Sequence, residues 1–259
     1  MYKLVISSFD KTLIDDDLAI PVSTVLTLDA LRRSGVKFVV ATGRDANFIK
    51  DYVRDVNFID YIVALNGSYV YDVVHEKIIY NKAISKTIIK KIVNKYKNTK
   101  CKIYLYTDNS KCYLNVLGEK TDEIIIREIN DFLDNNEVFK IEIHTKTKKY
   151  SKEIILELGD YSVNANYLEV DKDYYVEIVN KKVSKLNGVE VILKKEKIDI
   201  SDVVFYGYGE NDLSLLEKVG KGLILKNSLV KKYKKVKYDN NSKAVEKSLK
   251  EIFGSDVVI

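Results

Sequence analysis

Short apolar runs alternate with helix-period segments over the start of the chain. Residues 3–7 are largely apolar, and residues 36–41 are apolar on both faces, which is typical of parallel strands covered by helices on both sides. Between these runs, apolar residues recur every third position over 22–31, after Pro21 and before Gly35. Proline is favoured at the start of a helix and glycine just past its end. The pattern therefore predicts a strand–helix–strand unit with a right-handed crossover.

The middle of the chain has a different periodicity. Residues 68–80 alternate and turn back like a β-hairpin, and helix-period stretches then mix with short strand-like runs. Helices are predicted over 85–96, from about 121 to 133, and over 151–158. Residues 83–183 are therefore predicted to form an α+β module with its own core.

The first pattern resumes after this module. Lys185 begins a helix-period segment, and a strand over 202–207, a further helix and a last short strand follow. The predicted fold is α/β: a doubly wound, parallel-sheet core made of residues 1–82 and 184–259, with the α+β module inserted between its two segments.

Polar clusters stand where the core strands are predicted to end. They are residues 8–12, residues 42–44, Lys185 and residues 207–212. In open α/β sheets, ligands bind at the carboxyl ends of the strands. Four such clusters around one insert predict a single ligand site in the core.

The clusters carry sequence motifs in a defined order. They are "MYKLVISSFDKTLI" at the start, "VVATGR", "VEIVNKKVSKLNGVEVIL" after the insert, and "VVFYGYGENDLSLL". In this order the motifs resemble the haloacid dehalogenase (HAD) superfamily, in particular Cof-type phosphatases with a large α+β cap of the C2 type. The resemblance covers essentially the whole chain, and it implies a HAD-like core with the insert as cap.

The resemblance implies a role for each matching residue. Asp10 corresponds to the general acid/base, and Lys185 to the lysine that faces the phosphate, so these two are the candidate catalytic residues. The candidate phosphate-binding residues are Thr42, Gly43, Lys185 and Asn211. Asp10 and Asp212 are the remaining candidates for a magnesium site. Arg44 and the loop amides around residues 9–12 could also hold an anion.

Two positions depart from the family pattern. Ser8 stands where the family has its nucleophilic aspartate, and Tyr208 stands where it has a magnesium-binding aspartate. Shifting the register to make Asp10 the nucleophile fails, because Ile14 would then replace the hydroxyl residue Thr12. No histidine or other base is placed in the motifs to activate Ser8.

The two departures change the expected chemistry together. Magnesium prefers anionic oxygens as ligands, so a site without these two carboxylates binds the ion poorly. Losing two negative carboxylates together with the doubly positive magnesium ion keeps the local charge balanced. We therefore expect an inactive, metal-free phosphatase homologue that binds a small phosphorylated ligand or has a regulatory, sensing or scaffolding role, with Tyr208 filling the former metal position. The alternative is a magnesium-dependent hydrolase of small phosphorylated metabolites such as sugar phosphates.

Each candidate residue also has a purely structural interpretation. Asp10 and Asp212 could cap a loop and a helix. Thr42 and Gly43 could form a tight turn, and Lys185 could be a solvated lysine at a helix start.

Composition narrows the partners and the compartment. The 259 residues carry 43 basic and 38 acidic side chains, a net charge of +5, which does not by itself indicate a nucleic-acid partner. Binding of nucleic acid by the lysine surface is a third interpretation, which salt-dependent DNA binding would favour.

No apolar stretch approaches the roughly 18 residues of a membrane span. Two cysteines and no signal-like start predict a reduced, cytoplasmic protein. The ligand, any protein partner and the oligomeric state stay open.

Overall fold

The chain divides into two compact units. The computed structural model describes residues 1–54, 56–108, 110–114, 124–170, 173–228, 230–231, 233 and 235–254. Met1–Tyr80 and Lys185–Ile259 make one unit, called here the core unit, and Asn81–Ser184 make the inserted unit. The sequence placed these boundaries at 82/83 and 183/184. Each unit has its own sheet and its own apolar cluster.

The core unit is built on a seven-stranded sheet in the order β13-β12-β1-β2-β3-β4-β5. Its strands are β1 (Leu4–Ser7), β2 (Lys37–Ala41), β3 (Tyr61–Ala64), β4 (Tyr69–Asp72), β5 (Lys77–Asn81), β12 (Val203–Gly207) and β13 (Lys221–Ile224). The strands from β13 to β3 pair in parallel, and β4 pairs antiparallel with β3. All four residues of β1 and all four of β3 are buried, as expected for strands covered on both faces.

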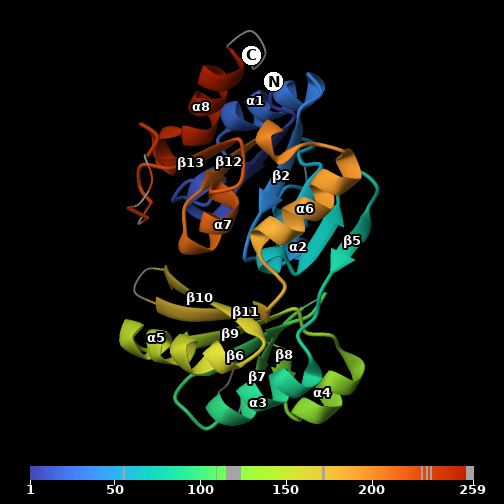
Figure 1. Cartoon of the computed structure of the whole chain (residues 1–259), viewed down its shortest axis with the longest axis vertical. Helices are drawn as coiled ribbons and strands as arrows, with labels where there is room; N and C mark the ends of the chain where they lie inside the picture. Colours follow the sequence, from blue (N-terminus) through green and yellow to red (C-terminus); the bar gives the residue numbers. More distant parts are fainter. Residues whose placement is uncertain are drawn as a thin grey trace. The chain divides into compact units, whose positions relative to one another are not determined.

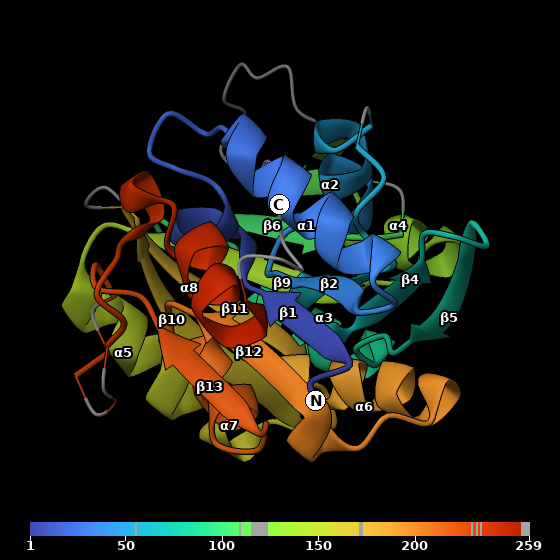
Figure 2. The ribbon, with the colours of Figure 1, turned by 90° about the horizontal axis from the view of Figure 1, so that it is seen from above.

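Helices cover both faces of this sheet. They are α1 (Val22–Arg33), α2 (Ala46–Tyr52), α6 (Lys185–Glu196), α7 (Leu213–Leu216) and α8 (Ala244–Phe253). Figure 2 shows α1 and α8 on the opposite side of the sheet from α6 and α7. On the α6 side, Leu4, Ile6 and Phe205 pack with Val189 and Ile192 of the helix. Short helical turns follow several strands: η1 (Phe9–Leu13), η2 (Leu65–Gly67) and η5 (Glu210–Asp212).

The inserted unit has a six-stranded sheet in the order β10-β11-β9-β6-β7-β8, drawn from green to yellow in Figure 1. Its strands are β6 (Lys102–Tyr106), β7 (Lys111–Leu114), β8 (Ile124–Ile126), β9 (Lys140–Thr145), β10 (Val163–Val170) and β11 (Asp173–Asn180). Its helices are α3 (Lys86–Tyr96), α4 (Ile129–Asn135) and α5 (Lys148–Glu157). All three helices contribute side chains to one apolar cluster with alternate residues of β6, β9 and β11. Among the described residues of this unit, the other face of the sheet has no helix.

One predicted helix is wrong. The sequence predicted a helix from about 121 to 133, but Ile124–Ile126 form β8 and α4 begins at Ile129; residues 121–123 lie outside the described part. Three successive β-branched side chains favour a strand, and pairing with β7 supplies the hydrogen-bonding partner.

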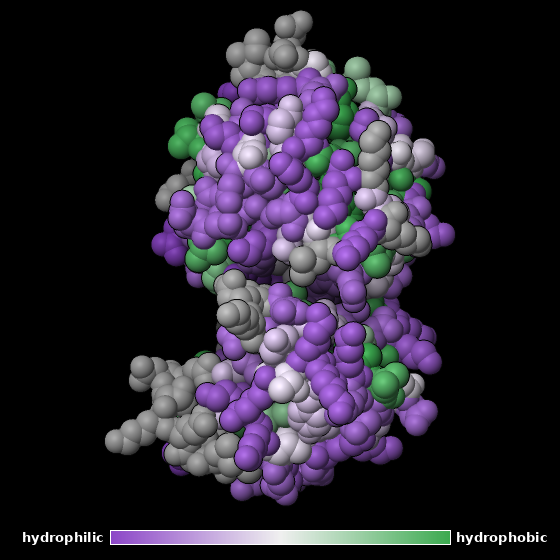
Figure 3. Space-filling view, turned by 90° about the vertical axis from the view of Figure 1, so that its left-hand side faces the viewer, coloured by the Kyte–Doolittle hydropathy of each residue, from purple (hydrophilic) through white to green (hydrophobic). Residues whose placement is uncertain are grey.

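The surface of the described residues is mixed in polarity. On the face shown in Figure 3, hydrophilic residues dominate and hydrophobic residues are scattered among them. No helix in the described part of the chain has both the length and the apolar character needed to cross a membrane.

Candidate functional site

The core strands deliver the predicted site residues to one edge of the sheet. Ser8 follows β1 and Thr42 follows β2, and these two strands pair in parallel. The N–H of Ser8 donates to the carbonyl of Tyr206 on β12, 2.8 Å away, which ties the end of β1 to the strand that precedes residues 207–212. Beyond Ser8 the chain turns sharply, with Lys11 in the left-handed region at φ 56°.

A buried ion pair stands at the centre of this edge. The Lys185 ammonium lies 2.7 Å from Oδ1 of Asp212, and the two side chains are 2% and 1% exposed. Oδ2 of Asp212 accepts hydrogen bonds from the N–H groups of Tyr208 (2.8 Å) and Gly209 (3.0 Å). The same ammonium lies 3.5 Å from the Ser8 hydroxyl. The interpretation of Lys185 as a solvated lysine is therefore wrong.

Close packing at a glycine sets the start of α6, where Lys185 lies. A Cβ added at Gly188 would stand 2.6 Å from Cγ1 of Val63 and 3.1 Å from Cα of Gly67. Glycine therefore lets α6 approach β3 and η2 more closely than any other residue would.

We expect Gly188→Ala to destabilise the protein by about 1–3 kcal/mol, the usual cost of overpacking. The helix propensity of alanine, about 1 kcal/mol better than that of glycine in a helix interior, opposes this cost. A stabilising result would therefore show that Val63 and Gly67 move aside at little cost. Urea unfolding measures the change. Gly159→Ala is the matched control, because nothing lies within 4 Å of a Cβ at Gly159.

Thr42 and Asn211 each form a hydrogen bond within the loops of the site, Thr42 in the loop after β2 and Asn211 in the loop after β12. The hydroxyl of buried Thr42 accepts a hydrogen bond from the N–H of Arg44 at 3.1 Å, and a hydroxyl that accepts one bond still has a proton to donate. Gly43 lies between these two residues. Nδ2 of Asn211 donates to Oδ1 of Asn66 at 3.1 Å. The geometry orients the Thr42 side chain and links Asn211 to the loop after β3.

Asp10 has a partner that the sequence did not identify. Nε of Arg44 lies 2.9 Å from each carboxylate oxygen of Asp10, and its Nη2 lies 2.7 Å from Oδ1. The guanidinium also stacks on the ring of Phe48, 4.3 Å from its centroid. The available signal was an arginine two residues after Thr42, in the loop that follows β2, the strand next to the one that precedes Asp10. Sequence reasoning considered Arg44 for anion binding and missed this pairing.

Tyr208 takes part in the loop through its main chain. Its N–H donates to Asp212, its carbonyl accepts a hydrogen bond from the Ser228 hydroxyl, and the residue is half-buried. The expectation that the ring fills the former metal position stays a prediction.

The donor set does not fit magnesium. This ion prefers anionic oxygens in octahedral geometry. The Asp10 carboxylate is held by Arg44, and the Asp212 carboxylate accepts bonds from Lys185 and two N–H groups. Ser8 and Tyr208 offer neutral oxygens. In the described part of the chain, no group of three or more His, Cys, Asp or Glu is arranged to hold a metal ion.

A second cluster of charged residues lies on the helix-free face of the inserted unit's sheet. The buried Lys140 ammonium lies 3.0 Å from Oε2 of Glu142 and 2.8 Å from Oε1 of Glu177. Glu142 and Glu177 are directly opposite each other on β9 and β11. The Tyr106 hydroxyl also donates to Glu142, at 3.1 Å, and His144 contacts it at 2.7 Å. His144 is itself half-buried in this cluster.

The charges in this cluster shift each other's titration. Burial by itself raises the pKa of Glu142, but the Lys140 ammonium and His144 outweigh burial and hold that pKa well below its usual range. Burial likewise lowers the pKa of Lys140, and the two glutamates outweigh it and raise that pKa. The charged forms of Glu142 and Lys140 are therefore the stable ones in the folded protein.

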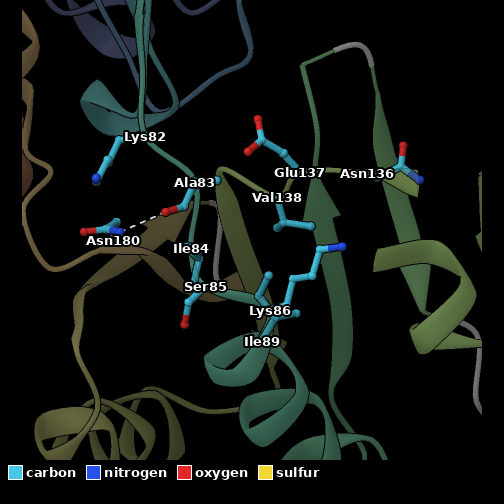
Figure 4. Close-up of a pocket in the computed structure, with 10 residues that line it drawn as sticks. All are labelled: Lys82, Ala83, Ile84, Ser85, Lys86, Ile89, Asn136, Glu137, Val138 and Asn180. Carbon is cyan, nitrogen blue, oxygen red and sulfur yellow. Dashed lines mark hydrogen bonds between the residues drawn. The ribbon is translucent and has the colours of Figure 1, made fainter. Parts of the chain in front are cut away.

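A cavity of about 360 Å³ also lies in the inserted unit, at the start of α3. Figure 4 shows its lining residues, which are Lys82, Ala83, Ile84, Ser85, Lys86, Ile89, Asn136, Glu137, Val138 and Asn180. None of these residues belongs to the polar clusters at residues 8–12, 42–44, 185 and 207–212. The Ser85 side chain already caps α3 by accepting a hydrogen bond from the N–H of Ile88.

Comparison with known proteins identifies relatives over nearly the whole chain. A family model described as haloacid dehalogenase-like hydrolase matches residues 5–249. A protein of Buchnera aphidicola subsp. Baizongia pistaciae, named "Putative phosphatase", is 28% identical over 241 residues, which cover 88% of each chain.

Solved structures are similar over the same length. A phosphatase of the HAD enzyme superfamily from Bacteroides thetaiotaomicron, BT1666, superposes with a TM-score of 0.83 and 18% identity, covering 98% of this chain and 96% of that one. The HAD subclass IIB sugar phosphatase BT4131 superposes with a TM-score of 0.80 and 19% identity, covering 97% and 99%. These structures share the fold with this chain, and the predicted α/β fold class is confirmed.

Proposed function

Because the chain belongs to the haloacid dehalogenase-like hydrolase family, we propose that it has kept the family's phosphate site and lost the family's chemistry. The protein would bind a small phosphorylated ligand without a metal and act as a regulatory or sensing pseudophosphatase. The insert would act as its cap. The observation that carries this proposal is the buried Lys185 ammonium, 3.5 Å from the hydroxyl of Ser8, where the resembled family has a nucleophilic carboxylate.

The charges of the site support anion binding without catalysis. Lys185 supplies a desolvated positive charge and Thr42 a hydroxyl donor, and charge-assisted hydrogen bonds are the stronger kind. The Ser8 hydroxyl contacts the Lys185 ammonium, and an ammonium cannot accept its proton. A serine without a general base is a poor nucleophile.

The second candidate function is magnesium-dependent hydrolysis of sugar phosphates or similar metabolites. It is favoured by the similarity to the sugar phosphatase BT4131 and to the Buchnera relative. The occupied carboxylates of Asp10 and Asp212 weigh against it, because a metal would have to displace Arg44 or Lys185.

Calorimetric titration with inorganic phosphate and with glucose 6-phosphate tests the proposal. We expect the same affinity in EDTA and in magnesium, and hydrolysis of a panel of phosphate esters at background in both. Thr42→Val removes the hydroxyl donor and should weaken binding about tenfold or more, the value of one hydrogen bond to a charged group. Thr27→Val, at a buried threonine of α1, is the matched control.

The opposite result is also specific. Turnover by the unmodified protein that requires magnesium and disappears in Lys185→Ala would overturn the proposal and establish the hydrolase.

A further inference from the structure

The Asp10–Arg44 ion pair has short contacts, as in a strong interaction, but both side chains are partly exposed to solvent, which weakens it. Three contacts of 2.7–2.9 Å join the two side chains, but Asp10 is 42% exposed and Arg44 is 38% exposed. Water competes for both groups, so an exposed pair of this kind stabilises a protein little. A small change in the site can therefore separate them.

Arg44 is attached to the anion-binding residues on one side. Its N–H donates to the hydroxyl of Thr42, so the two residues hold one loop conformation. The guanidinium stacks on Phe48, whose ring in turn lies 6.0 Å from Tyr52 in a stacked arrangement and meets the edge of Phe9. These rings support the arginine through the face of its guanidinium, while Nε and Nη2 at its edge bind the Asp10 carboxylate.

Asp10 is attached to the same site on the other side. It follows Ser8 by two residues in the turn after β1, and Ser8 contacts the Lys185 ammonium. Two anionic carboxylates, Asp10 and Asp212, thus balance two cations, Lys185 and Arg44. Asp212 is buried and accepts three hydrogen bonds, so its pair with Lys185 is the fixed one. The half-exposed Asp10–Arg44 pair is the one that can exchange.

We propose that Arg44 is the built-in cation of this site and exchanges between two anions: Asp10 when the site is empty, and the phosphoryl group of a bound ligand. This inference rests on the proposed phosphate binding and adds its regulation, because the Asp10 carboxylate then competes with the ligand for one guanidinium. A planar guanidinium binds carboxylate and phosphate in the same two-point geometry. A phosphoryl group can therefore replace the Asp10 carboxylate on Arg44 with the same hydrogen bonds.

A double-mutant cycle with inorganic phosphate in EDTA tests the exchange. Asp10→Asn frees Arg44 and should tighten phosphate binding about fivefold, the upper range for an exposed ion pair. Arg44→Gln should weaken binding about tenfold or more, because it removes a charge-assisted contact. In the Arg44→Gln background, Asp10→Asn should change the affinity by less than about twofold, because the competitor then has nothing to release.

The matched control is Arg54→Gln, which removes an arginine from another exposed pair, with Asp51, and should leave the affinity unchanged. The Nε–H resonance of Arg44, assigned by its loss in Arg44→Gln, should shift during a phosphate titration of the wild-type protein. A shift that saturates at the calorimetric affinity supports direct contact.

Each failure has its own signature. If Asp10→Asn tightens binding equally with and without Arg44, the carboxylate acts by simple repulsion and the exchange is overturned. If Arg44→Gln lowers the melting temperature but not the affinity, Arg44 is a structural clamp. In both cases a dependence on Thr42 and Lys185 would leave the proposed function intact. Absence of phosphate binding in all four proteins of the cycle overturns both.

Discussion

The double variant Ser8→Asp, Tyr208→Asp is expected to hydrolyse phosphate esters in the presence of magnesium, while the wild-type protein stays at background. The first change supplies a carboxylate that can attack phosphorus next to the Lys185 ammonium, which lies 3.5 Å from Oγ of Ser8. The second supplies an anionic oxygen for a divalent cation at the loop held by Asp212. An essential nucleophile is commonly worth about 10⁴–10⁶ in rate, so we expect a gain of at least about 10³-fold.

Each single variant is expected to gain far less. Ser8→Asp alone adds a negative charge with no metal to balance it, and Tyr208→Asp alone creates a metal ligand without a nucleophile. Release of p-nitrophenol from p-nitrophenyl phosphate measures the rates, with EDTA and with the triple variant that adds Lys185→Met as controls. Equal activity of Ser8→Asp alone, or activity of the double variant in EDTA, would contradict the assignment of the two positions.

Lys140→Met is expected to destabilise the inserted unit by about 3–5 kcal/mol, the cost of breaking a buried ion pair by removing one partner. The buried carboxylates of Glu142 and Glu177 face each other across β9 and β11, and the Lys140 ammonium lies between them. Methionine has a similar length but no charge, so two desolvated negative charges would lose their shared cation.

Calorimetric unfolding and hydrogen exchange of β9 and β11 measure this loss. Lys149→Met, at a highly exposed lysine of α5, is the control and should change stability by less than about 0.5 kcal/mol. The triple variant with Glu142→Gln and Glu177→Gln should recover most of the loss, because no unpaired charge remains. If the triple variant is no more stable than Lys140→Met, the cost comes from packing and not from charge.

The same network makes a prediction about pH. The pKa of Glu142 is lower in the folded protein than its ordinary value of 4.5. Its contribution to the free energy of unfolding is therefore fully present above pH 4.5 and is lost as the pH falls through the lower pKa of the folded state. Acid should therefore weaken the inserted unit, and Glu142→Gln should flatten that part of the stability profile.

The sequence by itself determined the fold class and the place of the site at one edge of the core sheet. The apolar runs of β1 and β2 and the helix-period residues of α1 follow from local periodicity, because a strand buried on both faces needs an apolar run. The motif order brought Ser8, Thr42, Lys185 and Asp212 to one sheet edge, because parallel strands end at the same edge. Ser8 and Tyr208 are departures that the sequence states directly.

Tertiary structure alone decided which charges pair. Asp10 meets Arg44, 34 residues away, because β1 and β2 are neighbours and because the chain reverses at Lys11 in the left-handed region. Lys140 meets Glu177 because β9 lies beside β11, an order that periodicity does not encode. Local patterns report which face of an element is apolar, whereas an ion pair depends on strand order, register and desolvation, and these exist only once the chain has folded.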